Sequence, residues 1–203
     1  MAELRNEIPQ ADNEPSAHSN AKGNVLNSMD SLSPCLPDGS FVDDCALESD
    51  LEMYFPDHYV PSDSERMLLY RELDNLAGNN NYNCQLSTLN SQLDAYRKRL
   101  VDRFGAIPDV AEELIQVVPL RVLGKQLGIE KILLKQQNMY LYFVSNPDSP
   151  YFQSEAFGSI LNYVSQHPRQ CNFREAKGKR SVVITNVPSV ASALTICRAI
   201  ATD

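Results

Sequence analysis

Two helical patterns separated by a glycine and a proline occupy residues 86–128, and no other stretch constrains the fold as strongly. In the first pattern, apolar side chains recur every three or four positions and predict one buried stripe along an amphipathic helix. The stripe consists of Leu86, Leu89, Leu93, Tyr96, Leu100 and Phe104. Gly105 predicts the end of the helix, because helices commonly end at a left-handed residue, and Pro108 prevents its continuation.

The second pattern predicts a helix that begins near Asp109 and ends at Gly128. Asp109 and Glu112 have the spacing of a helix cap and its partner three residues later. Pro119 removes a backbone donor inside this helix, so we expect a kink or a break near Val118. The expected inward residues are Val110, Leu114, Val117, Val118 and Leu123.

The link between the two patterns is short, which favours an antiparallel helix pair with a charged group near one end. The group consists of Arg97, Lys98, Arg99, Asp102 and Arg103. One interpretation is a solvated helix face, in which Asp94 and Lys98 form an i,i+4 ion pair. The other is a polar docking surface. Composition alone favours the solvated face.

Apolar and acidic residues alternate over residues 41–55, which predicts a strand with one buried and one solvated face. The expected buried face is Cys45, Leu47, Ser49, Leu51, Met53 and Phe55. Pro56 and Pro61 end this strand. Ser62 and Glu65 then have the spacing of a capping box, which predicts a helix that ends at Gly78. The expected inward residues of this helix are Leu69, Tyr70, Leu73 and Leu76.

After Gly128 the pattern returns to alternation and predicts short strands at 129–134, 140–144, 171–173 and 182–184. Turns are expected at 136–138 and 176–179, and helices over 152–164 and from Pro188 to Ile200. In the second strand the alternating apolar positions are Tyr140, Tyr142 and Val144. This order predicts an α+β domain, in which a small mixed β-sheet packs with several helices, including the antiparallel pair.

The chain divides into a tail and a folded domain. Residues 1–40 contain four prolines and few apolar side chains, so they bury too little surface to offset the entropy of ordering. We expect a flexible linker there and a folded domain over 41–203. The five cysteines form no CxxC pair, which indicates reduced thiols in a cytoplasmic protein. Membrane contact is not expected, because no secretion signal or long apolar run is present.

No residue pattern predicts a catalytic, cofactor-binding or metal-binding site. The three histidines, His18, His58 and His167, are far from one another and from any cysteine at zinc-ligand spacing. The sequence also lacks glycine-rich phosphate-binding motifs and the elbow motif of a catalytic nucleophile.

A second charged group could contact nucleic acid. It consists of Arg174, Lys177, Lys179 and Arg180. Two observations oppose this role: the net charge of the chain is −8, and no aromatic residues interleave with the group to form a stacking platform. A charged hairpin turn is the favoured interpretation, and an accessory nucleic-acid-binding domain is the alternative function.

Four ordered blocks of sequence resemble the C-terminal domain of the bacterial transcription-repair coupling factor. They are FPDHYVP at 55–61, ERMLLYREL at 65–73, LVDRFGAIPD at 100–109 and LGKQLGIEKI at 123–132. The corresponding family patterns are roughly P-x-x-Y-I/V-P, E-R-L-x-x-Y, L-I-D-R-F-G-x-x-P and L-G-I. The likeness extends from about Phe41 to the end of the chain.

The resemblance implies a parent protein that is a large double-stranded DNA translocase, with an upstream motor that uses ATP and Mg²⁺. Such a translocase removes stalled RNA polymerase and recruits UvrA for nucleotide excision repair. The C-terminal domain of the family is regulatory and has no catalytic residues. It docks on a UvrB-like module of its own chain and masks the surface that binds UvrA. Residues 1–40 would connect this domain to the motor.

The resemblance also implies which residues contact the partner. The family docking surface is polar and includes the acidic residue of the D-R-F-G block, which is Asp102 here. Many members have an acidic residue three positions earlier, where this sequence has Arg99. The expected partner-docking residues are therefore Asp102, its neighbour Arg103, and Arg99 as a departure that changes the charge pattern.

Overall fold

The structure is a computed structural model that describes residues 41–78, 86–176 and 179–202. The expected linker at 1–40 lies outside these residues, as do Cys35, Cys84 and the centre of the turn at 176–179. The elements in chain order are β1 (Ala46–Ser49), α1 (Asp63–Gly78), α2 (Leu86–Phe104), α3 (Asp109–Gln126), β2 (Ile129–Lys135), β3 (Asn138–Phe143), η1 (Pro150–Gln153), α4 (Glu155–Gln166), β4 (Cys171–Ala176), β5 (Lys179–Thr185) and α5 (Val190–Thr202).

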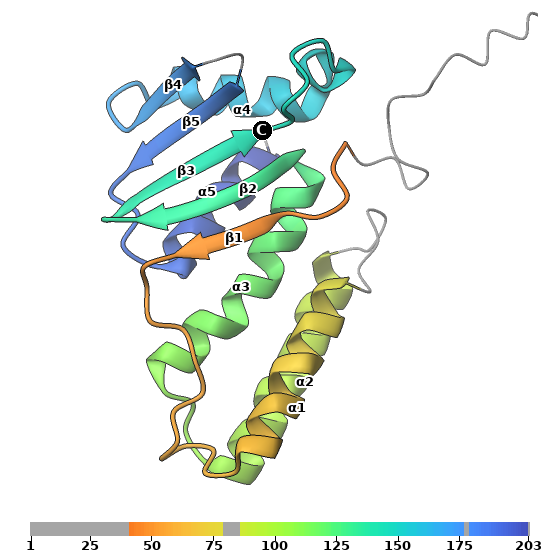
Figure 1. Ribbon diagram of the computed structural model, residues 1–203, viewed down its shortest axis with the longest axis vertical. Coiled ribbons are helices and arrows are strands. Elements are labelled where there is room, and N and C mark those ends of the chain that lie inside the picture. Colours follow the sequence, from red (N-terminus) through yellow and green to blue (C-terminus); the bar gives the residue numbers. More distant parts are fainter. Residues whose placement is uncertain (1–40, 79–85, 177–178, 203) are drawn as a thin grey trace, which may run out of the picture. The chain divides into compact units, whose positions relative to one another are not determined.

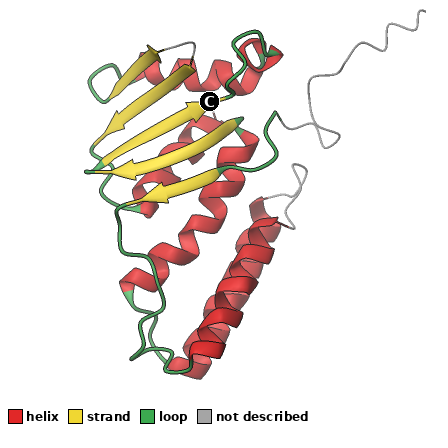
Figure 2. Cartoon of the chain, in the orientation of Figure 1, coloured by secondary structure: helices red, strands yellow, loops and turns green. Residues whose placement is uncertain are grey.

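The strands form one five-stranded sheet in the order β1-β2-β3-β5-β4. β1 pairs with β2 in parallel, and every other pairing is antiparallel, so the sheet is mixed. Helices α3, α4 and α5 lie against one face of the sheet, as Figures 1 and 2 show. The expected α+β architecture is confirmed.

Helix α3 contributes to two hydrophobic cores. Leu120 and Leu123, in its second half, pack with the sheet and with α4 and α5. Ala111 and Ile115, in its first half, pack with α1 and α2 in a separate helical core. The helical core also contains the predicted stripe of α2, in which Leu89, Leu93, Tyr96 and Leu100 are buried.

All three helix ends expected at glycine are confirmed: α1 ends at Gly78, and the other two glycines adopt a left-handed conformation. Gly105 has a φ of +87° and its N–H donates to the Val101 carbonyl at 3.0 Å. Gly128 has a φ of +69° and donates to Lys125, also at 3.0 Å. Glycine adopts this left-handed conformation without the steric cost that other L-residues incur.

The predicted start of α3 at Asp109 is confirmed, but the predicted capping pair of Asp109 and Glu112 is wrong. Pro108 occupies the cap position without a side-chain hydrogen bond, and Asp109 is the first helical residue. The Glu112 carboxylate does not complete a capping box, because it accepts hydrogen bonds from Arg97 on α2. Of the kink or break expected near Val118, the break is absent, since α3 continues through Pro119 to Gln126 as one helix.

Several strand and helix predictions also need correction. β1 covers only Ala46–Ser49, although burial alternates beyond it, because the chain leaves the sheet toward the helical core, where Phe55 is buried. The inward residues of β3 are Met139, Leu141 and Phe143, so Tyr140 and Tyr142 lie on the opposite face. The helix expected over 152–164 is divided into η1 and α4 by Ser154, which caps α4.

The turn expected at 136–138 is confirmed, but it contains only two residues, because Asn138 already belongs to β3. Lys135 pairs with Asn138, and the intervening Gln136 and Gln137 have φ values of 52° and 58°. Two successive left-handed residues are typical of a type I′ hairpin turn, whose twist matches that of the flanking strands. Glutamine here replaces the more usual asparagine and glycine, which explains why the sequence only weakly indicated the turn.

The two helix-ending glycines provide a matched test of stability. Ala at Gly105 should cost about 1–2 kcal/mol of unfolding free energy, because the φ is strained but the space is open. Ala at Gly128 should cost at least about 1 kcal/mol more, since its Cβ would also overlap the buried ring of Tyr151. Urea unfolding of both variants measures the difference, and equal losses would contradict the tight packing at Gly128.

Candidate docking surface

Two of the three expected docking residues face α1. Arg99 and Arg103 lie one turn apart on α2, and their guanidinium groups form ion pairs with Glu72 and Glu65 of α1. Glu65 therefore contributes to a helix–helix contact, although Ser62 still accepts a hydrogen bond from its N–H at 3.4 Å. From Arg99 to Arg103 the residue number rises along α2, whereas their partners fall from Glu72 to Glu65 along α1. The two helices are therefore antiparallel.

A groove of about 380 Å³ lies between α1 and α2 beside these ion pairs. Its apolar lining consists of Leu68, Leu69, Tyr96, Leu100 and Phe104. Leu68 is 60% exposed, which is unusual for a large aliphatic side chain beside a groove. The Tyr96 hydroxyl donates to the Leu69 carbonyl at 3.2 Å and fixes the groove floor. The groove thus combines an apolar lining with a charged rim.

The third expected residue, Asp102, lies outside the groove on an exposed part of α2. Its carboxylate forms no hydrogen bond or ion pair with the other described residues. Its neighbour Val101 is 48% exposed. The structure therefore brings Arg99 and Arg103 together, and leaves the Asp102 carboxylate available to a cation from outside the domain.

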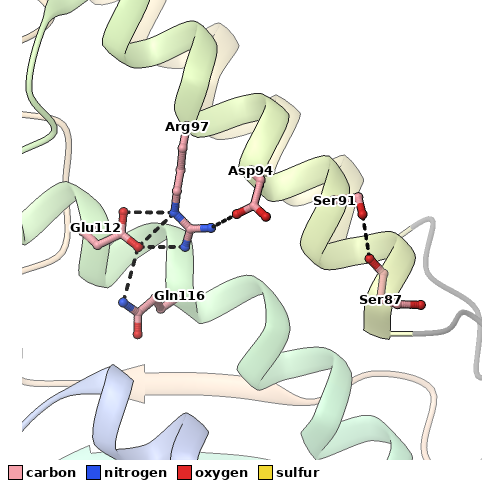
Figure 3. Close-up of polar contacts among 6 residues, drawn as sticks. All are labelled: Ser87, Ser91, Asp94, Arg97, Glu112 and Gln116. Carbon is pink, nitrogen blue, oxygen red and sulfur yellow. Dashed lines mark hydrogen bonds and ion pairs between the residues drawn. The ribbon is translucent and has the colours of Figure 1, made fainter.

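A polar network on the other side of α2 holds this helix against α3 (Figure 3). Arg97 donates to both carboxylate oxygens of Glu112, with Nη2 at 2.7 Å from Oε1 and Nε at 3.1 Å from Oε2. Gln116 donates to the same carboxylate at 3.3 Å. Asp94 pairs with Arg97 at 3.3 Å and not with Lys98 as expected. Such bidentate pairs restrict geometry more than single contacts, so they position α2 against α3.

Arg121 forms a polar junction that the sequence did not indicate. Its Nη2 lies 2.6 Å from Asp44 and its Nη1 lies 3.1 Å from Asp74, and its Nε donates to the Cys45 carbonyl at 3.2 Å. Burial opposes the charge, but the two carboxylates outweigh it and raise the pKa of Arg121. Only the fold brings together partners that are 47 and 77 positions away in sequence.

The histidines and two buried cysteines of the described residues lie away from the groove. His58 is exposed, and His167 stacks on Tyr163 at the end of α4 with ring centroids 4.2 Å apart. Burial raises the pKa of the Cys197 thiol to about 12, and raises that of Cys45 further. Within the described ranges, no three His, Cys, Asp or Glu side chains are grouped to hold a metal ion. No helix among these residues is long and apolar enough to span a membrane.

The second charged group is divided by the sheet. Arg174 and Lys179 are exposed, at positions of β4 and β5 that point away from the helices. Arg180 points to the helical side, where its guanidinium lies 4.4 Å from the centroid of the Phe152 ring and 3.6 Å from Glu175. Lys177 lies outside the described residues.

Substitution of Glu112 tests the network that positions α2. Glu112→Gln removes the carboxylate that accepts from Arg97, and should reduce the unfolding free energy by about 1 kcal/mol or more, because both side chains are partly buried. Glu72→Gln, at the more exposed pair with Arg99, should cost less than about 1 kcal/mol. Chemical unfolding with 0.1 M and 1 M salt separates the two cases, and a larger loss at Glu72 would contradict this ranking.

Comparison with known proteins agrees with this architecture. The chain matches the TRCF domain family over residues 49–154, just over half of its length. It is 24% identical over 124 residues to the transcription-repair-coupling factor of Rickettsia typhi, which covers 61% of this chain and 10% of that protein. The Helicobacter pylori transcription-repair-coupling factor is 30% identical over 111 residues, or 54% of this chain and 10% of that protein.

A solved structure has a similar fold. The crystal structure of the C-terminal domain of a transcription-repair coupling factor superposes with a TM-score of 0.59 at 15% identity, covering 78% of this chain and 92% of that domain. At this identity the likeness establishes the fold alone, whereas the family match establishes descent. The chain therefore belongs to the TRCF domain family, and the described residues have the fold of the C-terminal domain of a transcription-repair coupling factor.

Proposed function

We propose that this domain is a non-catalytic regulatory module of an ATP-dependent DNA translocase that couples transcription to nucleotide excision repair. It docks on a UvrB-like module of its parent and masks the surface that UvrA binds. The chain aligns with about a tenth of the length of its curated relatives, so a relative has ample further sequence for such a module. The motor with ATP and Mg²⁺, and the sites for RNA polymerase and double-stranded DNA, belong to that further sequence, and the parent acts in the cytoplasm.

The observation that carries this proposal is the groove between α1 and α2 with the unpaired Asp102 beside it. The exposed Leu68 and Val101 offer apolar contacts, and Asp102 offers an unneutralised carboxylate. A partner with an apolar side chain next to a Lys or Arg would complement both features. Arg99 and Arg103 are held by Glu72 and Glu65, so they form the rim without attracting a second carboxylate strongly.

The same surface suits a reversible contact, which the domain can release while the parent protein functions. Its charges lie at the rim in solvent, where ion pairs contribute at most about 1 kcal/mol each. A small apolar contact and a few rim charges hold the partner with a modest free energy, which binding of another protein can overcome. A domain that masks a binding surface reversibly requires such a balance.

Charge reversal at Asp102 tests the docking surface. Asp102→Lys should weaken binding to an isolated UvrB-like module about tenfold, because it places like charges together at the contact. The melting curve should not change, since Asp102 has no partner within the described domain. Fluorescence titration at low salt measures the affinity.

The matched control is Asp148→Lys, which makes the same charge change at an exposed loop position away from α2. It should leave the affinity within about twofold of the unchanged protein. Equal weakening by both variants would indicate a general charge effect and remove Asp102 from the surface. No binding by the unchanged protein would contradict docking itself.

Masking makes a separate prediction. The domain and UvrA should compete for the UvrB-like module, so added UvrA should release the labelled domain. The affinity of UvrA calculated from the half-release concentration, with competition taken into account, should equal its affinity for the free module. Asp102→Lys should make this release easier. Formation of a ternary complex by size-exclusion chromatography would retain docking but contradict masking.

A further inference from the structure

The face of the sheet opposite the helices carries an ordered set of aromatic and basic side chains. Helices α3, α4 and α5 cover one face, and no described helix covers the other, which faces the viewer in Figure 1. The strand register places two rows of side chains across this open face. The rows are Glu48, Leu133, Tyr140, Val183 and Asn172, and Ala46, Lys131, Tyr142, Ser181 and Arg174.

Tyr140 and Tyr142 are adjacent aromatic side chains on this face. Both are half-buried, and neither packs into the sheet core or the helical core. Two residues of a strand span ~7 Å, so the two rings are separated by about twice the ~3.4 Å rise of a stacked nucleotide strand. An extended single strand could therefore place a base on each ring. Between Tyr142 and Arg174, the small Ser181 leaves room above the sheet.

The charge of the open face differs from that of the whole chain. Among described positions on the strands of this face, four side chains are basic: Lys131, Lys135, Arg174 and Lys179. Glu48 of β1 pairs with Lys131 at 2.6 Å, and Asp50, just after β1, accepts a hydrogen bond from the Gln136 N–H beside Lys135. Glu130, at the register shift beside Lys131, has its carboxylate bound by Ser145. The face is thus net basic in a chain of net charge −8.

We propose that this open face binds single-stranded nucleic acid. Tyr140 and Tyr142 stack with bases, and Lys131, Lys135 and Arg174 contact the phosphates around them. The sequence opposed such a role because no aromatic residues interleave with the basic group around Arg174, and the adjacent Phe173 points to the opposite face of the sheet. The register removes that objection, since it places Tyr142 of β3 in the same row as Arg174 of β4.

The proposed face is separate from the docking surface. It is built on the strands, whereas Asp102 and the groove belong to α1 and α2. A domain docked through α2 is therefore able to contact a displaced strand or a transcript through its sheet. Failure of either activity leaves the other unaffected, so the two proposals are tested independently.

Fluorescence anisotropy with labelled oligo(dT), oligo(U) and a duplex of equal length tests the proposal on the full chain. Either single strand should bind with a Kd of roughly 10 to 100 µM at about 50 mM salt. The log–log dependence of affinity on salt should have a slope of about −2 to −3, as expected for three or four neutralised phosphates. The duplex should bind more weakly, because its bases are not free to stack on tyrosine.

Single substitutions assign the binding to the open face. Tyr142→Ala should reduce affinity about fivefold or more, and Tyr142→Phe should retain it, because phenylalanine keeps the stacking surface. Arg174→Ala should reduce both affinity and the salt slope. Tyr54→Ala removes a tyrosine that is 45% exposed on the segment between β1 and α1, and should change affinity less than about twofold.

Three outcomes would overturn the proposal. They are the absence of anisotropy change up to about 100 µM protein at low salt, equal binding of duplex and single strands, and equal losses for Tyr142→Ala and Tyr54→Ala. Circular dichroism of each variant confirms that its fold is retained, and the Phe variant keeps the test valid if the Ala variant unfolds.

Discussion

The structure depends on the burial of α3 on more than one side. This helix packs with α1 and α2 in the helical core and with β1, β2 and α5 in the sheet core, so it joins the two cores. Ile115 and Leu123 are fully buried, one in each core. Burial of such a side chain stabilises the fold by roughly 1.5–3 kcal/mol. A helix that is apolar around most of its circumference has no free side to expose, so the open groove and the open sheet face lie on other elements.

Polar contacts set the geometry around this shared helix. Arg97 and Glu112 join α2 to α3, and Arg121 joins α3 to Asp74 of α1 and to the start of β1. Each contact is partly shielded from solvent on the arginine side, so it restricts orientation more than an isolated surface pair does. The helical pair that carries the groove is thereby held in one orientation to the sheet.

The sequence was most informative where the determinants are local. The stripe of α2 and the positive φ of Gly105 and Gly128 follow from spacing and from glycine chemistry, which act within a few residues. Prediction failed where two local patterns compete. In β3, both Tyr140–Tyr142 and Met139–Leu141 satisfy an alternating pattern, and only packing against the helices decides which pair is inside. Glu112 had the spacing of a capping residue, yet Arg97 from another helix binds it.

Sequence alone determined the α+β class, the order of the elements, the ends of the central helices, and the family, because these depend on periodicity and on short motifs. Only the tertiary structure decided which charges remain free. Arg99, Asp102 and Arg103 are near neighbours in one helix, but two of them are neutralised by α1 and one is not. The tertiary structure also places Tyr142 and Arg174 on one face of the sheet. The physical reason is that surfaces form from side chains distant in sequence, and their register is set by core burial.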